Sequence, residues 1–238
     1  LPENNSLYLG FSGPFLMTQD NGVWSSPGMT QFFIKDSDDQ PMIWDKQETG
    51  SYNSHLEQTY WNKKWEVEQQ LVFISGNTAL QQITVTNRSD MEIPLNSGFQ
   101  GSLFNIGLSL TNEDESLKLT SMKSDAVGYV QILREDNDLF IQDSSYTANN
   151  RTILLKPKES KVYHVAQTFI FPNISWKNER QLISKIDFDS VLKARKIEKE
   201  NELSALIESS KPQFKDKKYA RALAKAQLTL LCNSSRFV

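Results

Sequence analysis

Alternation of apolar and polar residues runs through most of the first 171 positions and constrains the fold more than any other feature. Ile106, Leu108 and Leu110 alternate with glycine and serine, and Ile83 and Val85 alternate with threonines. A period of two is typical of a β-strand with one buried face. Further runs of this kind lie at 30–34, 61–74, 117–122, 127–133, 139–142, 152–156 and 161–171. No helical pattern separates these runs, so they predict a mainly β fold, a large antiparallel β-sandwich, rather than a parallel α/β sheet.

The pattern changes from strand-like to helix-like after Pro172. From Trp176 to Ser210 the chain is rich in Lys, Glu, Leu and Ile and contains no Gly or Pro, which predicts linker helices with a thin apolar stripe. Lys211-Pro212 ends this segment, because proline lacks the backbone donor that a helix needs. Tyr219 to Leu231 is then alanine-rich and apolar on nearly all sides. Such a helix requires neighbours on several sides, so we expect it to be the first piece of a larger helical domain.

These patterns divide the chain into three predicted segments. They are a β-sandwich over 1–175, a helical linker over 176–211 and the truncated start of a helical domain over 212–238. The net charge is −3 and basic residues alternate with acidic ones, which gives no electrostatic support for nucleic-acid binding. No stretch approaches the ~20 apolar residues that a membrane span needs, so neither nucleic acid nor membrane is an expected partner.

Residues with catalytic chemistry are few. The two histidines, His55 and His164, lie in strand-like stretches far along the chain from the single cysteine, Cys232. This spacing favours structural or surface roles for the histidines and a small buried role for the cysteine over a Cys/His pair or a histidine metal site. The glycine, serine and histidine patterns of common nucleotide-binding and hydrolytic motifs are absent from the sequence. We therefore predict no cofactor and assign no catalytic residue within the chain.

An acidic cluster at Asp36, Asp38 and Asp39 has two interpretations. Carboxylate oxygens suit a hard cation, but the segment lacks the glycine and glutamate of a calcium-binding loop. An acidic hairpin turn is the favoured interpretation, and no metal is predicted.

Several aromatic residues could stack on sugar rings or fill the core. Trp44, Tyr60, Trp61 and Trp65 have both possible uses, and we interpret Trp61 and Trp65, four residues apart, as core or inter-sheet residues of one strand. Trp24 lies in the turn-rich segment DNGVWSSPG and is the better candidate for an exposed ring.

Three segments together resemble a known family. They are GFSGPFLMTQDNGVWSSPGMTQFFI at 10–34, TALQQITVTNRSDMEIPLNSGFQGSL at 78–103 and YARALAKAQLTLLCN at 219–233. In this order they resemble the amino-terminal region of bacterial members of glycoside hydrolase family 63. The TVTN stretch followed by a Ser-Asp turn, and the Thr-Leu pair shortly before Asn233, match positions typical of that family. The family usually continues with Trp-Arg-Ser-Pro after this asparagine, whereas the present chain continues with SSRFV.

The resemblance implies a large β-sandwich, a helical linker and an (α/α)6 barrel. Its members hydrolyse α-linked sugars with inversion, using one carboxylic acid to protonate the leaving oxygen and one carboxylate to activate a water. Both carboxylates of the family belong to the barrel, beyond Val238, so the resemblance assigns no catalytic residue here. It implies that the sandwich packs on the barrel and shapes its sugar pocket, with Phe11, Asp20 and Trp24 as rim residues from the loop at 11–28. It also implies a periplasmic or extracellular location.

Other interpretations stay open at this stage. The strand-turn-strand at 78–103 also occurs in trehalase-like, maltose-phosphorylase-like and glucoamylase-like enzymes, which share the sandwich-plus-barrel architecture. A free-standing carbohydrate-binding or adhesion sandwich would explain the aromatic residues, but it would leave the helix at 219–231 without neighbours.

Overall fold

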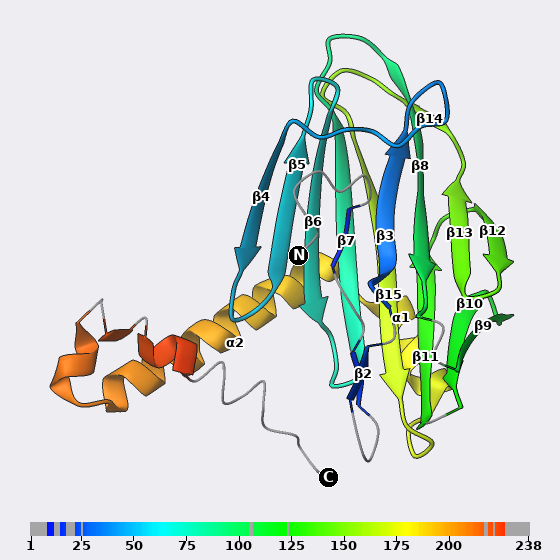
Figure 1. Ribbon diagram of the computed structural model, residues 1–238. Coiled ribbons are helices and arrows are strands. Elements are labelled where there is room, and N and C mark those ends of the chain that lie inside the picture. The colour runs from blue at the N-terminus through cyan, green and yellow to red at the C-terminus, as the bar shows by residue number, and fades with distance from the viewer. Residues whose placement is uncertain are drawn as a thin grey trace. The chain divides into compact units, whose positions relative to one another are not determined.

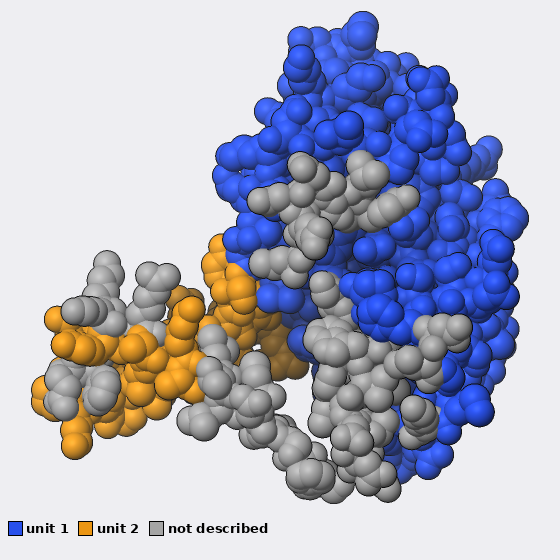
Figure 2. Space-filling model, viewed as in Figure 1, with its two compact units in different colours: residues 1–50, 56–186 blue, residues 51–55, 187–238 orange. Residues whose placement is uncertain are grey.

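The structure of the chain is a computed structural model. It describes residues 9–11, 15–17, 22–24, 26–104, 107–122, 124–216, 219–220 and 222–226. Its contacts divide the chain into two compact units, shown in Figure 2. Unit 1 comprises Leu1–Gly50 and Leu56–Ile186, and unit 2 comprises Ser51–His55 and Asp187–Val238.

Two antiparallel sheets, here called the large and the small sheet, dominate the described residues (Figure 1). The large sheet has the order β4-β5-β6-β7-β15-β11-β10-β9, and the small sheet has the order β12-β13-β8-β14, with β3 also paired to β8. The strands of the large sheet are β4 (Lys46–Ser51), β5 (Leu56–Trp61), β6 (Trp65–Phe73), β7 (Thr78–Asn87), β15 (Ser160–Ile170), β11 (Ser124–Leu133), β10 (Ser116–Ser121) and β9 (Leu108–Glu113). Those of the small sheet are β12 (Asn137–Gln142), β13 (Ser145–Asn150), β8 (Ile93–Ser102), β14 (Ile153–Leu155) and β3 (Gly28–Lys35). A separate pair, β1 (Phe15–Met17) and β2 (Gly22–Trp24), completes the strands.

The two sheets bury their apolar faces against each other, which confirms the predicted mainly β sandwich. Phe32 of β3 and Phe99 of β8 lie with ring centroids 5.3 Å apart, and Phe32 lies 5.5 Å from Tyr163 of β15. All three rings are almost fully buried. Ile83 and Val85 of β7 point into the same core, as their alternation with threonines predicts. Ile106 lies outside the described residues.

The tryptophans correct one detail of the sequence interpretation. Trp61 ends β5 and Trp65 begins β6, so a turn separates the two residues that we expected on one strand. Trp61 pairs with Glu66 and therefore shares the outer face of the sheet with it, whereas Trp65 is only 2% exposed in the core. Trp65 is thus a core residue as predicted, and Trp61 is not.

A polar network lies within the otherwise apolar core. Thr30 Oγ1 of β3 donates a hydrogen bond to Gln81 Oε1 of β7 (3.1 Å), and Gln81 Nε2 donates to Gln69 Oε1 of β6 (3.3 Å). Tyr60 of β5 donates its hydroxyl proton to Gln58 Oε1 (2.7 Å). All five side chains are at most 2% exposed. Buried amides need such partners, because an unpaired polar group inside a protein is costly.

Helix α1 (Trp176–Lys185) belongs to unit 1 and packs on the outer face of the large sheet at β15, β11 and the start of β7. The Trp176 ring stacks on Tyr129 of β11, with centroids 3.9 Å apart and planes inclined by 2°. The Glu179 carboxylate accepts hydrogen bonds from Ser75 Oγ (3.1 Å), Asn77 Nδ2 (3.1 Å) and Thr78 Oγ1 (2.9 Å). The helix is therefore fixed to the sheet by an aromatic stack and by three hydrogen bonds to the Glu179 carboxylate.

Replacing Glu179 with alanine is expected to lower the free energy of unfolding of unit 1 by about 2 kcal/mol, because three donors lose a charged acceptor. Amide hydrogen exchange should also become faster along α1. Lys177→Ala, an exposed change in the same helix, serves as the matched control and should leave both measurements close to those of the unmodified protein. Equal exchange rates in α1 for Glu179→Ala and the control would show that the carboxylate does not fix the helix.

Unit 2 contains the remaining helices. Asp187 caps the N-terminus of helix α2 (Phe188–Ser209): its Oδ2 accepts a hydrogen bond from the Ser190 amide (3.0 Å). A short 3-10 helix, η1 (Pro212–Lys215), follows it, and 219–220 and 222–226 are helical. Residues 221 and 227–231 of the predicted helix, and Cys232, lie outside the described residues. The predicted division into segments 1–175, 176–211 and 212–238 stays a prediction. The helical barrel to which the last segment would belong stays a prediction as well. No helix within the described ranges is long and apolar enough to cross a membrane.

Candidate functional site

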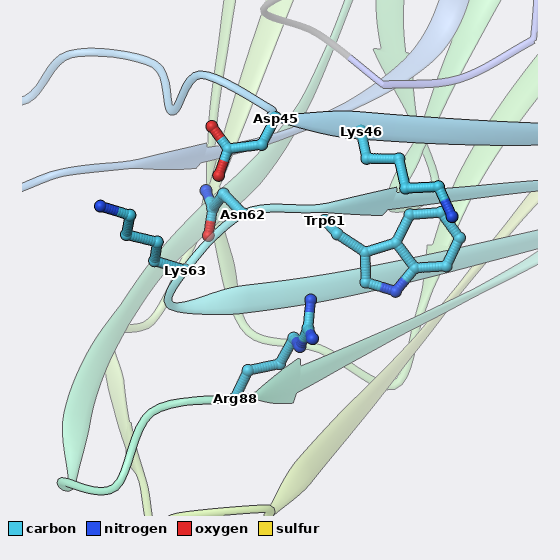
Figure 3. Close-up of a pocket in the computed structure, with 6 residues that line it drawn as sticks. All are labelled: Asp45, Lys46, Trp61, Asn62, Lys63 and Arg88. Atoms are coloured by element: carbon cyan, nitrogen blue, oxygen red, sulfur yellow. The ribbon is translucent and has the colours of Figure 1, made fainter.

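A surface cleft of about 600 Å³ lies at one end of the large sheet (Figure 3). Antiparallel pairing brings together the start of β4, the end of β5 and the end of β7, because Trp65 at the start of β6 pairs with Asn87. Segments that are distant in the sequence therefore meet at this end of the large sheet. The residues that line the cleft are Asp45, Lys46, Trp61, Asn62, Lys63 and Arg88.

Asn62 determines the local shape of the cleft. Its Oδ1 accepts hydrogen bonds from the backbone amides of Lys64 (2.9 Å) and Trp65 (2.8 Å), which closes the turn between β5 and β6. Its Nδ2 donates to the carbonyl oxygen of Ile43 (3.1 Å), which ties the segment before β4 to this turn. An asparagine side chain commonly replaces a backbone partner in a turn of this kind. Asn62 is 9% exposed and acts as a structural support that positions its neighbours.

Trp61 provides a half-buried aromatic surface on one wall of the cleft. Its indole N–H donates to Glu66 Oε2 on β6 (2.7 Å), and the Lys46 ammonium lies 4.8 Å from the ring centroid. A hydrogen bond at the edge and a cation over the ring restrict the orientation of the side chain. The ring is therefore held in place before any ligand arrives.

The charges around the cleft are mostly positive. Lys46 forms an ion pair with Glu48 (2.5 Å), whereas the side chains of Lys63 and Arg88 form no ion pair within the described part of the chain. Figure 3 shows the Arg88 guanidinium extending toward the strand end that carries Trp61 and Asn62, while Lys63 points away. Asp45 is the acidic residue of the lining. The cleft thus combines an aromatic surface with donors that suit hydroxyl or anionic oxygens.

The structure describes the rim residues implied by the family resemblance only in part. Phe11 is only 8% exposed, and Trp24 ends β2, where its backbone pairs with Phe15. Asp20 lies outside the described residues. The rim assignment therefore stays a prediction, and Trp61 is the half-buried aromatic residue whose place in this cleft the sequence interpretation missed. The signal that could have revealed it is the WNKKW segment, in which asparagine marks a turn between two tryptophans.

The histidines make local contacts. His164 is hydrogen-bonded through Nε2 to Gln82 Oε1 (2.9 Å). His55 is hydrogen-bonded through Nδ1 to Ser54 Oγ (2.9 Å), and its ring stacks on Tyr52 with centroids 4.6 Å apart. These contacts are of the structural kind that the sequence favours for both residues.

The acidic cluster shapes a turn. Asp36 Oδ1 accepts hydrogen bonds from the backbone amides of Asp38 and Gln40 (both 2.9 Å), and Asp39 forms an ion pair with Lys35 (2.8 Å). Within the ranges that the structure describes, no group of three or more His, Cys, Asp or Glu residues could hold a metal ion.

Comparison with known proteins gives structural similarities only. No protein-family model and no curated protein sequence matches the chain. A structure assigned as a kojibiose phosphorylase from the human microbiome aligns with 80% of this chain and 30% of its own, at a TM-score of 0.48 and 10% identity. One assigned as an aldose 1-epimerase from Escherichia coli K12 aligns with 67% of this chain and 80% of its own, at a TM-score of 0.44 and 10% identity. The heparan sulfate lyase HepC from Pedobacter heparinus aligns with 60% of this chain and 24% of its own, at a TM-score of 0.40 and 13% identity. The chain thus spans less than a third of the phosphorylase, and identities of this size do not establish a common activity.

Proposed function

We propose that the chain is the non-catalytic amino-terminal domain of a glycoside hydrolase that acts on α-linked glucosides or related sugars with inversion. In this proposal the sandwich packs on a helical barrel beyond Val238 and contacts the carbohydrate substrate, while the barrel supplies both catalytic carboxylates. Three observations support it: the β-sandwich, the helical segments that follow it, and the local resemblance to family 63. A periplasmic or extracellular location belongs to the same proposal, and cell fractionation would test it.

The observation that carries the carbohydrate part of the proposal is the orientation of Trp61. A flat aromatic ring matches the apolar C–H face of a sugar ring, and fixed donors beside it match the sugar hydroxyls. Trp61 is held by Glu66 and Lys46, and Arg88 reaches toward the same wall. Because the ring is restrained before binding, little side-chain freedom is lost when a sugar stacks on it.

Replacing Trp61 with alanine is expected to weaken maltotriose binding at this cleft by roughly tenfold, since a stacking surface is lost. The measurement is a titration of backbone amide chemical shifts at 45–46, 61–63 and 88. Trp61→Phe keeps an aromatic face and should retain most of the affinity. Unchanged amide shifts on adding maltotriose to the unmodified protein would show that the cleft is not a binding site for this sugar.

The assignment as a non-catalytic domain has a separate test. The isolated chain should release no product from α-glucosides or α-mannosides, whereas a longer protein that includes the residues encoded after Val238 should do so. Hydrolysis by the isolated chain that a single carboxylate substitution abolishes would place the catalytic groups within these 238 residues. A coding sequence that ends at Val238 would favour the alternative, a free-standing carbohydrate-binding or adhesion module.

A further inference from the structure

A second cleft of about 600 Å³ lies on the small sheet, and among the described residues none lines both this cleft and the Trp61 cleft. It opens where β13 ends and β14 begins. The residues that matter most for its chemistry are Lys35, Asn96, Asp138, Asn149, Arg151 and Thr152.

The cleft is located at an interruption in the hydrogen-bonded ladder on one side of β8. β13 pairs with β8 through residues 98–102, and β14 pairs with β8 through 93–95. Residues 150–152, the last of β13 and the two that connect it to β14, therefore have no ladder partner on β8. Thr152 Oγ1 bridges the interruption by donating to Asn96 Oδ1 (2.7 Å). Irregularities of this kind re-aim side chains and are common beside binding sites.

Strand register places several lining side chains on one face of the small sheet. Phe33 and Asn149 both pair with Gly98, and Asp138 pairs with Asn149, so these residues form one row across four strands. The Phe33 ring lies over Gly98, where a Cβ atom would come within 2.5 Å of Phe33 Cζ. Gly98 therefore provides the space that the buried ring occupies.

The polar side chains of this row, and Arg151 beside it, are available for a ligand. Asp138, Asn149 and Arg151 form no side-chain hydrogen bond or ion pair with any residue that the structure describes. Lys35 is already neutralised by Asp39 (2.8 Å). The negative charge of the unpaired Asp138 carboxylate and the positive charge of the unpaired Arg151 guanidinium cancel. This distinguishes the cleft from the positively charged cleft at Trp61.

A buried amide with an unused polar atom adjoins the same cleft. Asn150 is 7% exposed, and its Nδ2 donates to Ser97 Oγ (3.2 Å), which in turn donates to the Tyr163 hydroxyl (3.0 Å). Asn150 Oδ1 has no hydrogen-bond partner among the described residues. Turning the amide over would leave its other polar atom on that side, so one group stays unused in either orientation. Unsatisfied buried groups destabilise a fold and concentrate at functional sites.

We propose that this cleft binds a neutral saccharide. Asp138 presents two acceptors side by side, Arg151 presents paired donors, and Asn96 and Asn149 each present one donor and one acceptor. Neighbouring hydroxyls of a sugar ring donate and accept at a similar spacing, so planar groups of this kind match them in pairs. The volume is within the usual range for small-molecule sites. A strongly anionic ligand would face Asp138, and a strongly cationic one would face Arg151, so an uncharged ligand fits the balance of charges.

The test is a chemical-shift titration of the full chain with maltotriose, cellotriose and mannotriose, with trigalacturonate as the anionic comparison. Amides at 96–98 and 149–152 are expected to shift with at least one neutral trisaccharide. Asn149→Ala and Arg151→Ala should each weaken this binding by roughly tenfold. Thr147→Ala, two residues away on the same face of β13 but outside the cleft, should bind like the unmodified protein.

The outcomes separate this site from the Trp61 cleft. Trp61→Ala should leave the titration at 149–152 unchanged, so failure of one site does not imply failure of the other. The proposal is overturned if no neutral trisaccharide shifts these amides at about 10 mM, well above an ordinary weak dissociation constant. It is also overturned if trigalacturonate binds there more tightly than every neutral sugar, or if Asn149→Ala, with unchanged melting temperature, retains full affinity.

Discussion

Replacing Phe99 with alanine is expected to lower the free energy of unfolding of the sandwich by about 3–5 kcal/mol, the usual cost of removing a buried aromatic ring. Phe99 has no exposed surface, and its ring lies 5.3 Å from Phe32 and 6.4 Å from Tyr163. Because Tyr163 belongs to the large sheet and the two phenylalanines to the small one, the cavity would open between the sheets. Neighbouring side chains could fill it only by moving the sheets together.

The measurement is urea denaturation followed by tryptophan fluorescence. Phe140→Ala is the matched control, since it removes the same side chain from a position on β12 that is 63% exposed. This control should change stability by no more than about 0.5 kcal/mol. If both variants lost the same stability, the ring cluster would not hold the two sheets together.

Raising the pH from 9 to 11 is expected to destabilise the sandwich by about 4 kcal/mol. Burial raises the pKa of Tyr60 and of Tyr163 to about 12, and it raises the pKa of Tyr146 well above its ordinary value of 10.0. In the unfolded chain these hydroxyls ionise near pH 10, while the folded protein keeps them neutral. The unfolded state therefore holds fewer protons above pH 10, and stability falls as pH rises toward the folded pKa values. At pH 11, which lies above the unfolded pKa and below the folded ones, each tyrosine contributes about a third of this loss.

The test is the free energy of unfolding measured at pH 9, 10 and 11 for the unmodified protein and for Tyr163→Phe. The variant loses the hydrogen bond from Ser97, so its stability at pH 9 should be lower by about 1 kcal/mol. Its dependence on pH should be weaker by about one third, because two buried tyrosines remain. An identical pH dependence for the two proteins would show that Tyr163 does not contribute to the alkaline loss.

The strands could be predicted from the sequence because their buried faces repeat every second residue, as Ile83 and Val85 do in β7. The same rule failed at Trp61 and Trp65, whose spacing of four suggested one strand. Asn62 closes a turn between them, and a side chain that caps a turn leaves the apolar pattern unchanged. Gln69 and Gln81 also escaped prediction, because periodicity assigns polar residues to the surface and takes no account of their partners across the core.

The candidate sites could not be predicted, because each depends on contacts between distant segments. Asp45, Trp61 and Arg88 meet only when three strands end at the same edge of the large sheet. Asn96 and Arg151 meet only because β13 and β14 both pair with β8 and leave an interruption between them. The order of strands in a sheet is a property of the folded chain, and a single sequence carries little local signal for it.

The glutamine network also has a consequence for how the chain finds its fold. On β6 the outward Glu66 and Glu68 alternate with the inward Val67 and Gln69, so a slip of one residue would carry two carboxylates into the core. A slip of two residues would keep the apolar faces inward, and apolar packing alone discriminates weakly against it. The bond from Gln81 of β7 to Gln69 of β6 is directional and would be lost in that arrangement. The buried amides therefore favour one register of β6 on β7 over its shifted alternatives.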